Sequence, residues 1–235
     1  MAFRSKATTS SPSLGGGGTF TANMPAGYAA HDRLVAFFAS DTTGNTTTPP
    51  SGWTVPTGGT KLQFGNDGQS FEVFELLDAT GSDPTTWTTS GPGDLILTIL
   101  AFSGRHNSTA ASFCTGASGT ADDASPTPLS GSSGTAATGD DLVYCGCIDQ
   151  ANAAQIWTFA TYAGGGTWVE REDTGNSAWV SIGAATIDNV SSGAVGTVSS
   201  EATLSSGTGN SRGWGQFVLA IPAGSTTGPT INTQP

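Results

Sequence analysis

The stretch that decides the fold is GDLILTILAF, Gly93–Phe102. Its apolar side chains alternate onto two faces, and both faces are apolar: Leu95, Leu97 and Ile99 form one set, and Ile96, Leu100 and Phe102 form the other. The run is short, shows no sustained helical period, and is preceded by Gly and Asp, which is typical of a buried β-strand. We expect one face to enter a core, and the other to meet either a partner or a covering loop.

Similar apolar runs recur along the whole chain. They are rich in Val, Ile, Phe and Trp, and dense Gly and Pro punctuation between them leaves no room for helices of normal length. The sequence predicts strands at 34–39, 71–77, 95–102, 142–148, 156–162, 179–187 and 217–221, with weaker strands at 19–22, 59–64, 167–170 and 193–204. We therefore predict an all-β fold, a two-sheet antiparallel sandwich of the jelly-roll type over 19–224, with an extended N-terminal arm and glycine hinge at 1–18 and a C-terminal tail at 225–235.

An aspartate precedes three of the predicted strands, at Asp32, Asp94 and Asp140. An aspartate in this position accepts hydrogen bonds from main-chain N–H groups and closes a turn. The third case lies in TGDDLVYCGCID, 138–149, where two carboxylates precede a Cys-Gly-Cys sequence. A metal or thiol centre is the alternative interpretation, but a zinc site needs about four ligands and no histidine is near in sequence. We interpret Asp140 as a strand start, and Cys145 and Cys147 as small buried apolar residues.

Composition excludes several classes of function. Seven Lys and Arg face 18 Asp and Glu, which gives a formal net charge of −11 and a pI of about 4.2. Nucleic acid and anionic lipid would be repelled. The first residues lack the apolar run of a secretory signal, and no stretch reaches the roughly 18 apolar residues of a membrane span. Three cysteines also make a disulfide framework improbable. We predict a protein made and assembled in a cytosol, with no membrane and no nucleic-acid partner.

Residues with catalytic potential do not combine into a recognisable site. Ser211 lies in a Gly-x-Ser-x-Gly match that leads into a strand, which is the wrong context for a nucleophile elbow. His31 and His106 lie at predicted strand ends and loops, and the acidic loops 122–123 and 170–173 leave calcium as an alternative without its specific spacing. We predict no catalytic residue, no cofactor and no metal. The run Gly15, Gly16, Gly17 and Gly18 lacks the flanks of a phosphate-binding loop and is interpreted as a hinge.

The six tryptophans allow a second type of site, because aromatic faces stack on sugar rings. Trp53 and Trp87 lie beside prolines and turns, and Trp168 lies at a predicted strand. These three are candidates for glycan stacking, and the alternative is that they fill the core or plug the ends of the sandwich.

Several segments, taken in order, resemble the jelly-roll virion proteins of tailed bacteriophages. The resembling segments cover about 32–222: DRLVAFFAS, then TTTPPSGWTVP, QSFEVFELLD, DPTTWTTSGPGDLILTILAFSG, TGDDLVYCGCID and RGWGQFVLAIP. Each segment is a weak motif, and their order carries the information. Members of the family serve as capsid decoration (cement) proteins and as tail or fibre modules, so the resemblance indicates the fold more strongly than the function.

The resemblance implies a structural virion protein that decorates the capsid, binds the major capsid protein and self-associates as a dimer or trimer. The partner-binding residues that we predict are Phe3, Arg4 and Lys6 of the arm, whose positive charges suit an acidic capsid, and the hinge Gly15–Gly18. The alternative is a tail or fibre module that binds host-surface glycan. A glycan depolymerase would need two carboxylates about 5–10 Å apart; Glu72 and Glu75 fall on opposite faces of their strand, so we predict no enzymatic activity.

Overall fold

The structure is a computed structural model that describes residues 3–11, 16–42, 44–65, 69–104, 110–121, 127–132, 134–149, 156–159, 166–175, 180–194, 198–203 and 212–224. Within these ranges no helix has the length and apolar character of a membrane span. The strands in chain order are β1 (Phe3–Ser11), β2 (Gly18–Thr21), β3 (Arg33–Ser40), β4 (Thr47–Thr48), β5 (Leu62–Phe64), β6 (Gln69–Leu76), β7 (Thr86–Thr89), β8 (Leu95–Phe102), β9 (Phe113–Ala121), β10 (Thr127–Ser132), β11 (Thr135–Ala136), β12 (Asp141–Asp149), β13 (Ile156–Phe159), β14 (Val169–Gly175), β15 (Val180–Ile187), β16 (Gly193–Ala194), β17 (Val198–Thr203) and β18 (Arg212–Ile221).

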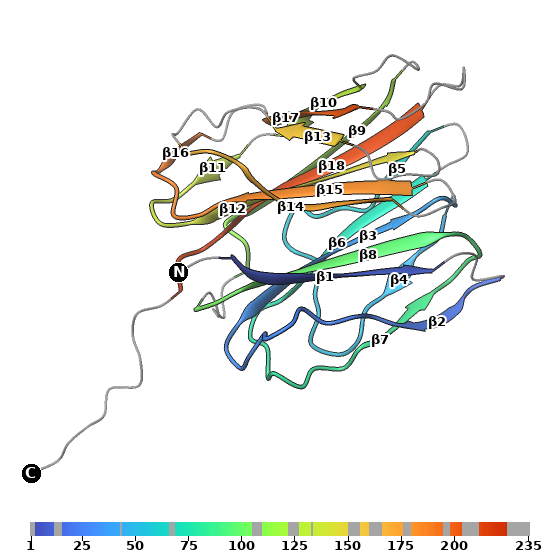
Figure 1. Ribbon diagram of the computed structural model, residues 1–235, viewed down its shortest axis with the longest axis horizontal. Coiled ribbons are helices and arrows are strands. Elements are labelled where there is room, and N and C mark those ends of the chain that lie inside the picture. The colour runs from blue at the N-terminus through green and yellow to red at the C-terminus, as the bar shows by residue number, and fades with distance from the viewer. Residues whose placement is uncertain are drawn as a thin grey trace, which may run out of the picture.

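Two five-stranded antiparallel sheets stack face to face and form the body of the molecule (Figure 1). Sheet A has the order β1-β8-β3-β6-β5, and sheet C has the order β14-β15-β12-β18-β9. Two three-stranded sheets lie outside them: sheet B, with the order β2-β7-β4, lies beside sheet A, and sheet D, with the order β10-β17-β13, lies beside sheet C. The predicted all-β antiparallel sandwich is confirmed.

The two halves of the chain repeat one topology. In the first half, 3–102, the order β1-β8-β3-β6 lies beside β2-β7-β4. In the second half, 113–221, β9-β18-β12-β15 beside β10-β17-β13 repeats it strand for strand, and β14 extends its sheet as β5 extends sheet A. We predicted a single sandwich unit over 19–224, whereas the structure repeats one strand order in the two halves of the chain, and these halves share a core.

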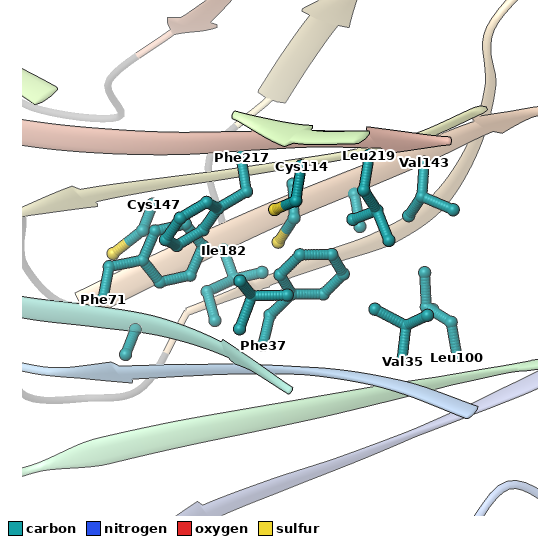
Figure 2. Packing of buried hydrophobic residues seen from close by; sticks show 14 of the residues in the cluster. Val35, Phe37, Phe71, Leu100, Cys114, Val143, Cys147, Ile182, Phe217 and Leu219 are labelled. Atoms are coloured by element: carbon teal, nitrogen blue, oxygen red, sulfur yellow. The ribbon is translucent and has the colours of Figure 1, made fainter. Parts of the chain in front are cut away.

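That shared core lies between sheets A and C (Figure 2). Phe37 and Phe71 project from sheet A toward Phe217 of sheet C, and the Phe71 and Phe217 ring centroids are 5.1 Å apart. Cys145 and Cys147 belong to this layer and are fully buried, as the alternation predicted. Both halves therefore contribute to one apolar interior.

The outer faces of sheets A and C are apolar as well, and the chain covers them itself. On sheet A, the side chains of Leu97 and Ile99 pack with Trp53 and with Trp87 of sheet B. On sheet C, a further cluster is formed by Ala136, Leu142, Tyr144, Trp168, Ala185, Ile187, Val190, Val218 and Ala220. The second face of GDLILTILAF therefore meets a cover from the same chain, which selects one of the two alternatives left open by the sequence.

The N-terminal arm requires a correction, because residues 3–11 form strand β1 of sheet A. β1 runs antiparallel to β8, from Phe3 opposite Phe102 to Ser11 opposite Leu95. Every residue of β8 is buried, so an unpaired edge of β8 would leave main-chain donors and acceptors unsatisfied in a dry environment. Pairing with β1 satisfies them, and the polar side chains of the supposed arm suit a half-exposed edge strand. Gly15 and the tail at 225–235 lie outside the described residues.

Because the core is shared, the two halves are expected to unfold together. Phe71→Ala and Phe217→Ala should each lower the free energy of unfolding by about 3–5 kcal/mol. The double variant should lose less than the sum of the two single losses by about 0.5–1.5 kcal/mol, the aromatic pair being lost only once. Urea unfolding followed by tryptophan fluorescence and by circular dichroism measures this. Separate transitions for the two halves would contradict a shared core.

Candidate functional site

Two of the predicted partner-binding residues, Phe3 and Lys6, lie at a seam where β1, the edge of sheet A, faces β14, the edge of sheet C. We call this the β1–β14 seam; it comprises Phe3, Lys6 and Thr8 on β1, and Arg171 and Glu172 on β14. Lys6 Nζ lies 2.9 Å from Glu172 Oε1, and the Thr8 hydroxyl donates to the other carboxylate oxygen. The Arg171 guanidinium carbon lies 4.2 Å from the Phe3 ring centroid. Side chains thus join the two halves at an edge where their strands belong to different sheets.

Arg4 points away from this seam and binds the first strand-start aspartate. Its Nε lies 2.8 Å from Asp32 Oδ2 and its Nη2 lies 3.2 Å from Asp32 Oδ1, which is a bidentate pair. Asp32 also accepts the Ala29 main-chain N–H at 2.9 Å, so it closes the turn predicted for it. Arg4 and Lys6 were expected to be free for an acidic partner; instead both neutralise carboxylates of their own chain.

The other described cationic side chains are engaged in the same way. Arg33 pairs with Glu75 in the interior, where their side chains are 0% and 1% exposed. Lys61 donates to the main-chain oxygen of Asn45, and Arg171 approaches Asp188 at 3.7 Å. Cations are scarce in this chain, and those with described side chains hold strands and loops together. The outer surface consequently keeps the acidic surplus.

Gly16, Gly17 and Gly18 connect β1 to β2 and all have positive φ, at 99°, 89° and 154°. A Cβ at Gly17 would lie 2.9 Å from the main-chain oxygens of Thr89 and Ser90. Glycine is thus needed at Gly17 both for conformation and for space. These three glycines form a fitted turn against the end of β7 in this structure.

The three candidate glycan-stacking tryptophans are buried: Trp53 is 6% exposed, Trp87 0% and Trp168 8%. The Trp53 and Trp87 ring centroids are 5.2 Å apart under the cover of sheet A, and Trp168 lies 6.1 Å from the Tyr144 ring. Thr54, which follows Trp53, pairs with Glu75 of β6, and Val169, which follows Trp168, pairs with Thr186 of β15. Because β6 and β15 are equivalent strands, Trp53 and Trp168 occupy equivalent corners of the two halves. Their faces are not available to a sugar ring, so the plug interpretation is correct and the stacking interpretation is wrong.

The Cys-Gly-Cys sequence is explained by the packing of both its faces. The cysteines face the core, where burial raises the pKa of the Cys145 thiol well above its ordinary value. Gly146 pairs with Gly183, and a Cβ at either glycine would lie within 2.6 Å of the Trp157 indole. The two glycines make the flat surface on which Trp157 lies. Asp140 closes the preceding turn by accepting the Ala137 N–H at 2.9 Å, as Asp32 does in the first half.

The acidic run Glu170–Asp173 also differs from expectation, because it lies in strand β14 and not in a loop. The register shifts between Glu170 and Glu172, which turns the Glu172 side chain inward to Lys6, where it is 4% exposed. In the part of the chain that the structure describes, no three His, Cys, Asp or Glu side chains gather as a metal site would require. Loop 122–123, His106 and Ser211 lie outside the described residues.

Glu72 is a buried carboxyl that the sequence analysis did not single out for this role. It lies on the outer face of sheet A, 7% exposed, and Oε1 accepts the Thr47 main-chain N–H at 3.1 Å. Burial raises the pKa of Glu72 to about 7, against the opposing effects of the Thr47 hydrogen bond and the charge of Lys61. Lys61 directly precedes β5, whose first residue Leu62 lies opposite Phe71, the neighbour of Glu72 in β6. Knowledge of this register, and not the composition, is what brings Lys61 and Glu72 together.

No family model, curated protein or solved structure matches the chain. Function is therefore argued from the geometry and from the resemblance of the segments quoted above.

Glu72 should make stability depend on pH. Its pKa is higher in the folded than in the unfolded chain, so the folded state holds the proton more tightly, and stability falls as pH rises from about 4.5 to about 7. Glu72→Gln should remove this loss and raise the free energy of unfolding at pH 8 by roughly 2–3 kcal/mol relative to wild type. Urea unfolding from pH 5 to 9 measures it, with the exposed Glu170→Gln as the matched control. Parallel pH profiles for wild type and Glu72→Gln would contradict this.

Removing one partner of the Arg33–Glu75 pair should lower the free energy of unfolding strongly, whereas replacing both partners by apolar residues should lower it little. Arg33→Met leaves a buried carboxylate without its cation and should cost about 3–5 kcal/mol, whereas Arg33→Met combined with Glu75→Leu should recover most of that loss. Thermal unfolding of the single and double variants tests this. If the double variant were no more stable than the single one, the charge pair would not be the dominant contact at this position.

Proposed function

We propose that this chain is a structural virion protein of a tailed bacteriophage, and specifically a capsid decoration protein that binds the outer capsid surface and stabilises the head. The segments that carry the resemblance fall on β3, β6, β8, β12 and β18 and on the Trp53 corner, which together make up the framework of both halves. The resemblance therefore concerns the frame of the molecule and not peripheral loops.

The main support for the proposal is that ionisable and thiol side chains of the two halves bind one another or fill the core. Arg33 and Glu75 neutralise one another inside the core, Lys6 and Glu172 fasten one half to the other, and the cysteines fill apolar space. Side chains that could take part in catalysis instead stabilise the fold. A layered block of this kind suits a subunit whose task is mechanical, and it favours a structural role over the depolymerase alternative.

Contact with the major capsid protein would be polar under this proposal. Val55 and Val169, at 56% and 46% exposed, are the large apolar side chains that the described surface exposes. The sequence leaves a partner or a covering loop as alternatives for the second apolar face of the sheets, and that face is covered within the chain. Hydroxyl groups, main-chain edges and acidic side chains would then make the capsid contact, with dimeric or trimeric self-association as part of the same proposal.

The proposal is tested on particles of the phage that encodes the chain, assembled without it. Purified full-length protein should co-sediment saturably with heads and raise the temperature at which heads release their DNA. Gold-labelled protein viewed on intact particles separates the alternatives. Label confined to tails, together with binding to a glycan array, would replace decoration by the tail or fibre module, and no binding to any particle would overturn the virion role.

A further inference from the structure

Strand β1 is attached to the molecule almost entirely through its main chain and polar side chains. None of its nine residues is buried, whereas every residue of its neighbour β8 is. Its side-chain attachments are the Arg4–Asp32 and Lys6–Glu172 ion pairs, the hydrogen bonds of Arg4 to Gly27 and of Thr8 to Glu172 and Thr98, hydrogen bonds from Asn23 to Thr8 and Thr9, and the half-buried Phe3. The Arg4 and Lys6 side chains are 38% and 42% exposed, but their carboxylate partners are buried, so loss of β1 would leave two buried carboxylates without a cation. Detaching β1 therefore exposes little apolar surface, and its cost is mainly polar.

Removal of β1 would leave the main-chain groups along one edge of β8 without hydrogen-bond partners. β8 lies between β1 and β3 and is buried along its whole length, so removal of β1 would open a dry row of main-chain donors and acceptors. The structure thus combines a strand that buries little apolar surface of its own with a position that requires a strand. Another copy of β1 fits that position in every detail, because it brings the same register and the same partners for Asp32 and Glu172.

β1 and its equivalent in the second half, β9, differ in how they are anchored. β1 is joined to β2 through the glycines Gly16–Gly18, and none of its residues is buried. In β9, Cys114 is 3% exposed and belongs to the shared core. The two strands have the same place in the topology, but β9 can leave its sheet only by withdrawing a buried side chain from the core, whereas β1 withdraws none.

We propose that β1 exchanges between copies of this protein, so that the β8 edge of one copy binds β1 of a second copy. The exchanged contact is the same as the closed one, with Phe3 opposite the partner's Phe102 and Lys6 on the partner's Glu172. Its net cost is then mainly the entropy of association, which a high local concentration offsets. The inference does not rest on the proposed function, because the purified chain is sufficient to test it.

Two variants of the full chain, each with one cysteine added to the three buried native ones, report on the exchange. Thr8 and Thr98 are opposite each other on β1 and β8, and their hydroxyl oxygens are 3.2 Å apart, so cysteines there face one another. Copies carrying only Thr8→Cys are mixed at high concentration with differently tagged copies carrying only Thr98→Cys, then diluted and oxidised. We expect a disulfide-linked heterodimer on non-reducing gels, in an amount that grows with protein concentration during mixing. Salt should accelerate its formation, since the ion pairs that hold β1 are screened.

Matched controls make every result decisive. The pair Thr115→Cys and Val218→Cys reports the equivalent strands β9 and β18 and should give no heterodimer, because Cys114 anchors β9 in the shared core. A single chain carrying both Thr8→Cys and Thr98→Cys shows that the pair oxidises. If that chain closes as a monomer while the mixed single variants give no heterodimer at any concentration, β1 does not exchange and the inference is overturned. Equal yields from the β1 and β9 mixtures would also overturn it, since collision would explain both.

Discussion

The structure depends on one constraint: its central strands are apolar on both faces. A sheet built from such strands needs an apolar layer above it and another below it, and two such sheets can share only one of those layers. Sheets A and C cover each other with one face, and sheets B and D and the corners that carry Trp53 and Trp168 cover the others. Four layers follow from that requirement. The strands of sheet B are short and rich in threonine because only one of their faces is buried; in β7, for example, Trp87 points inward between exposed Thr86 and Thr88.

The repeated topology shows which contacts the fold requires and which it leaves open. The turn made by Ala29 and Asp32 recurs with Ala137 and Asp140, down to the hydrogen bond that the aspartate carbonyl accepts from the N–H of Ala79 in one half and of Val190 in the other. The edges differ. On one side the halves meet through Lys6 and Glu172, and on the other Gly58 approaches so closely that a Cβ there would lie 2.2 Å from the Cys114 oxygen. Strand starts are fixed by main-chain geometry, whereas the sheet edges accept either an ion pair or a close main-chain contact.

Much of the fold was predictable from the sequence, because strands that are buried on both faces are visible in it as short apolar runs. The run 95–102 coincides with β8, and 142–148 lies within β12. The first strand of each half was missed: FRSKATTSS and FCTGASGTA are edge strands whose side chains are half-exposed, so they show no apolar alternation. The duplication was missed for a related reason, since Asp32 and Asp140 were visible as repeated strand starts but the residues between the strands differ. At the candidate site, Lys6 and Glu172 are 166 residues apart, and no local pattern joins them before the register of two sheets is known.

The use of charge also decides how this surface meets other molecules. Arg4, Lys6, Arg33, Lys61 and Arg171 are each committed to a carboxylate or a carbonyl of the same chain, while the formal net charge is −11. A partner that relies on anionic groups finds few free cations on the described surface. A partner that relies on apolar contact finds the outer faces of sheets A and C covered, together with the indoles of Trp53, Trp87, Trp157 and Trp168. What the surface does offer is hydroxyl groups, carboxylates and strand edges. Recognition of such a surface depends on matching hydrogen-bond geometry, and matched geometry is what a partner with a fixed, repeating surface can supply many times over.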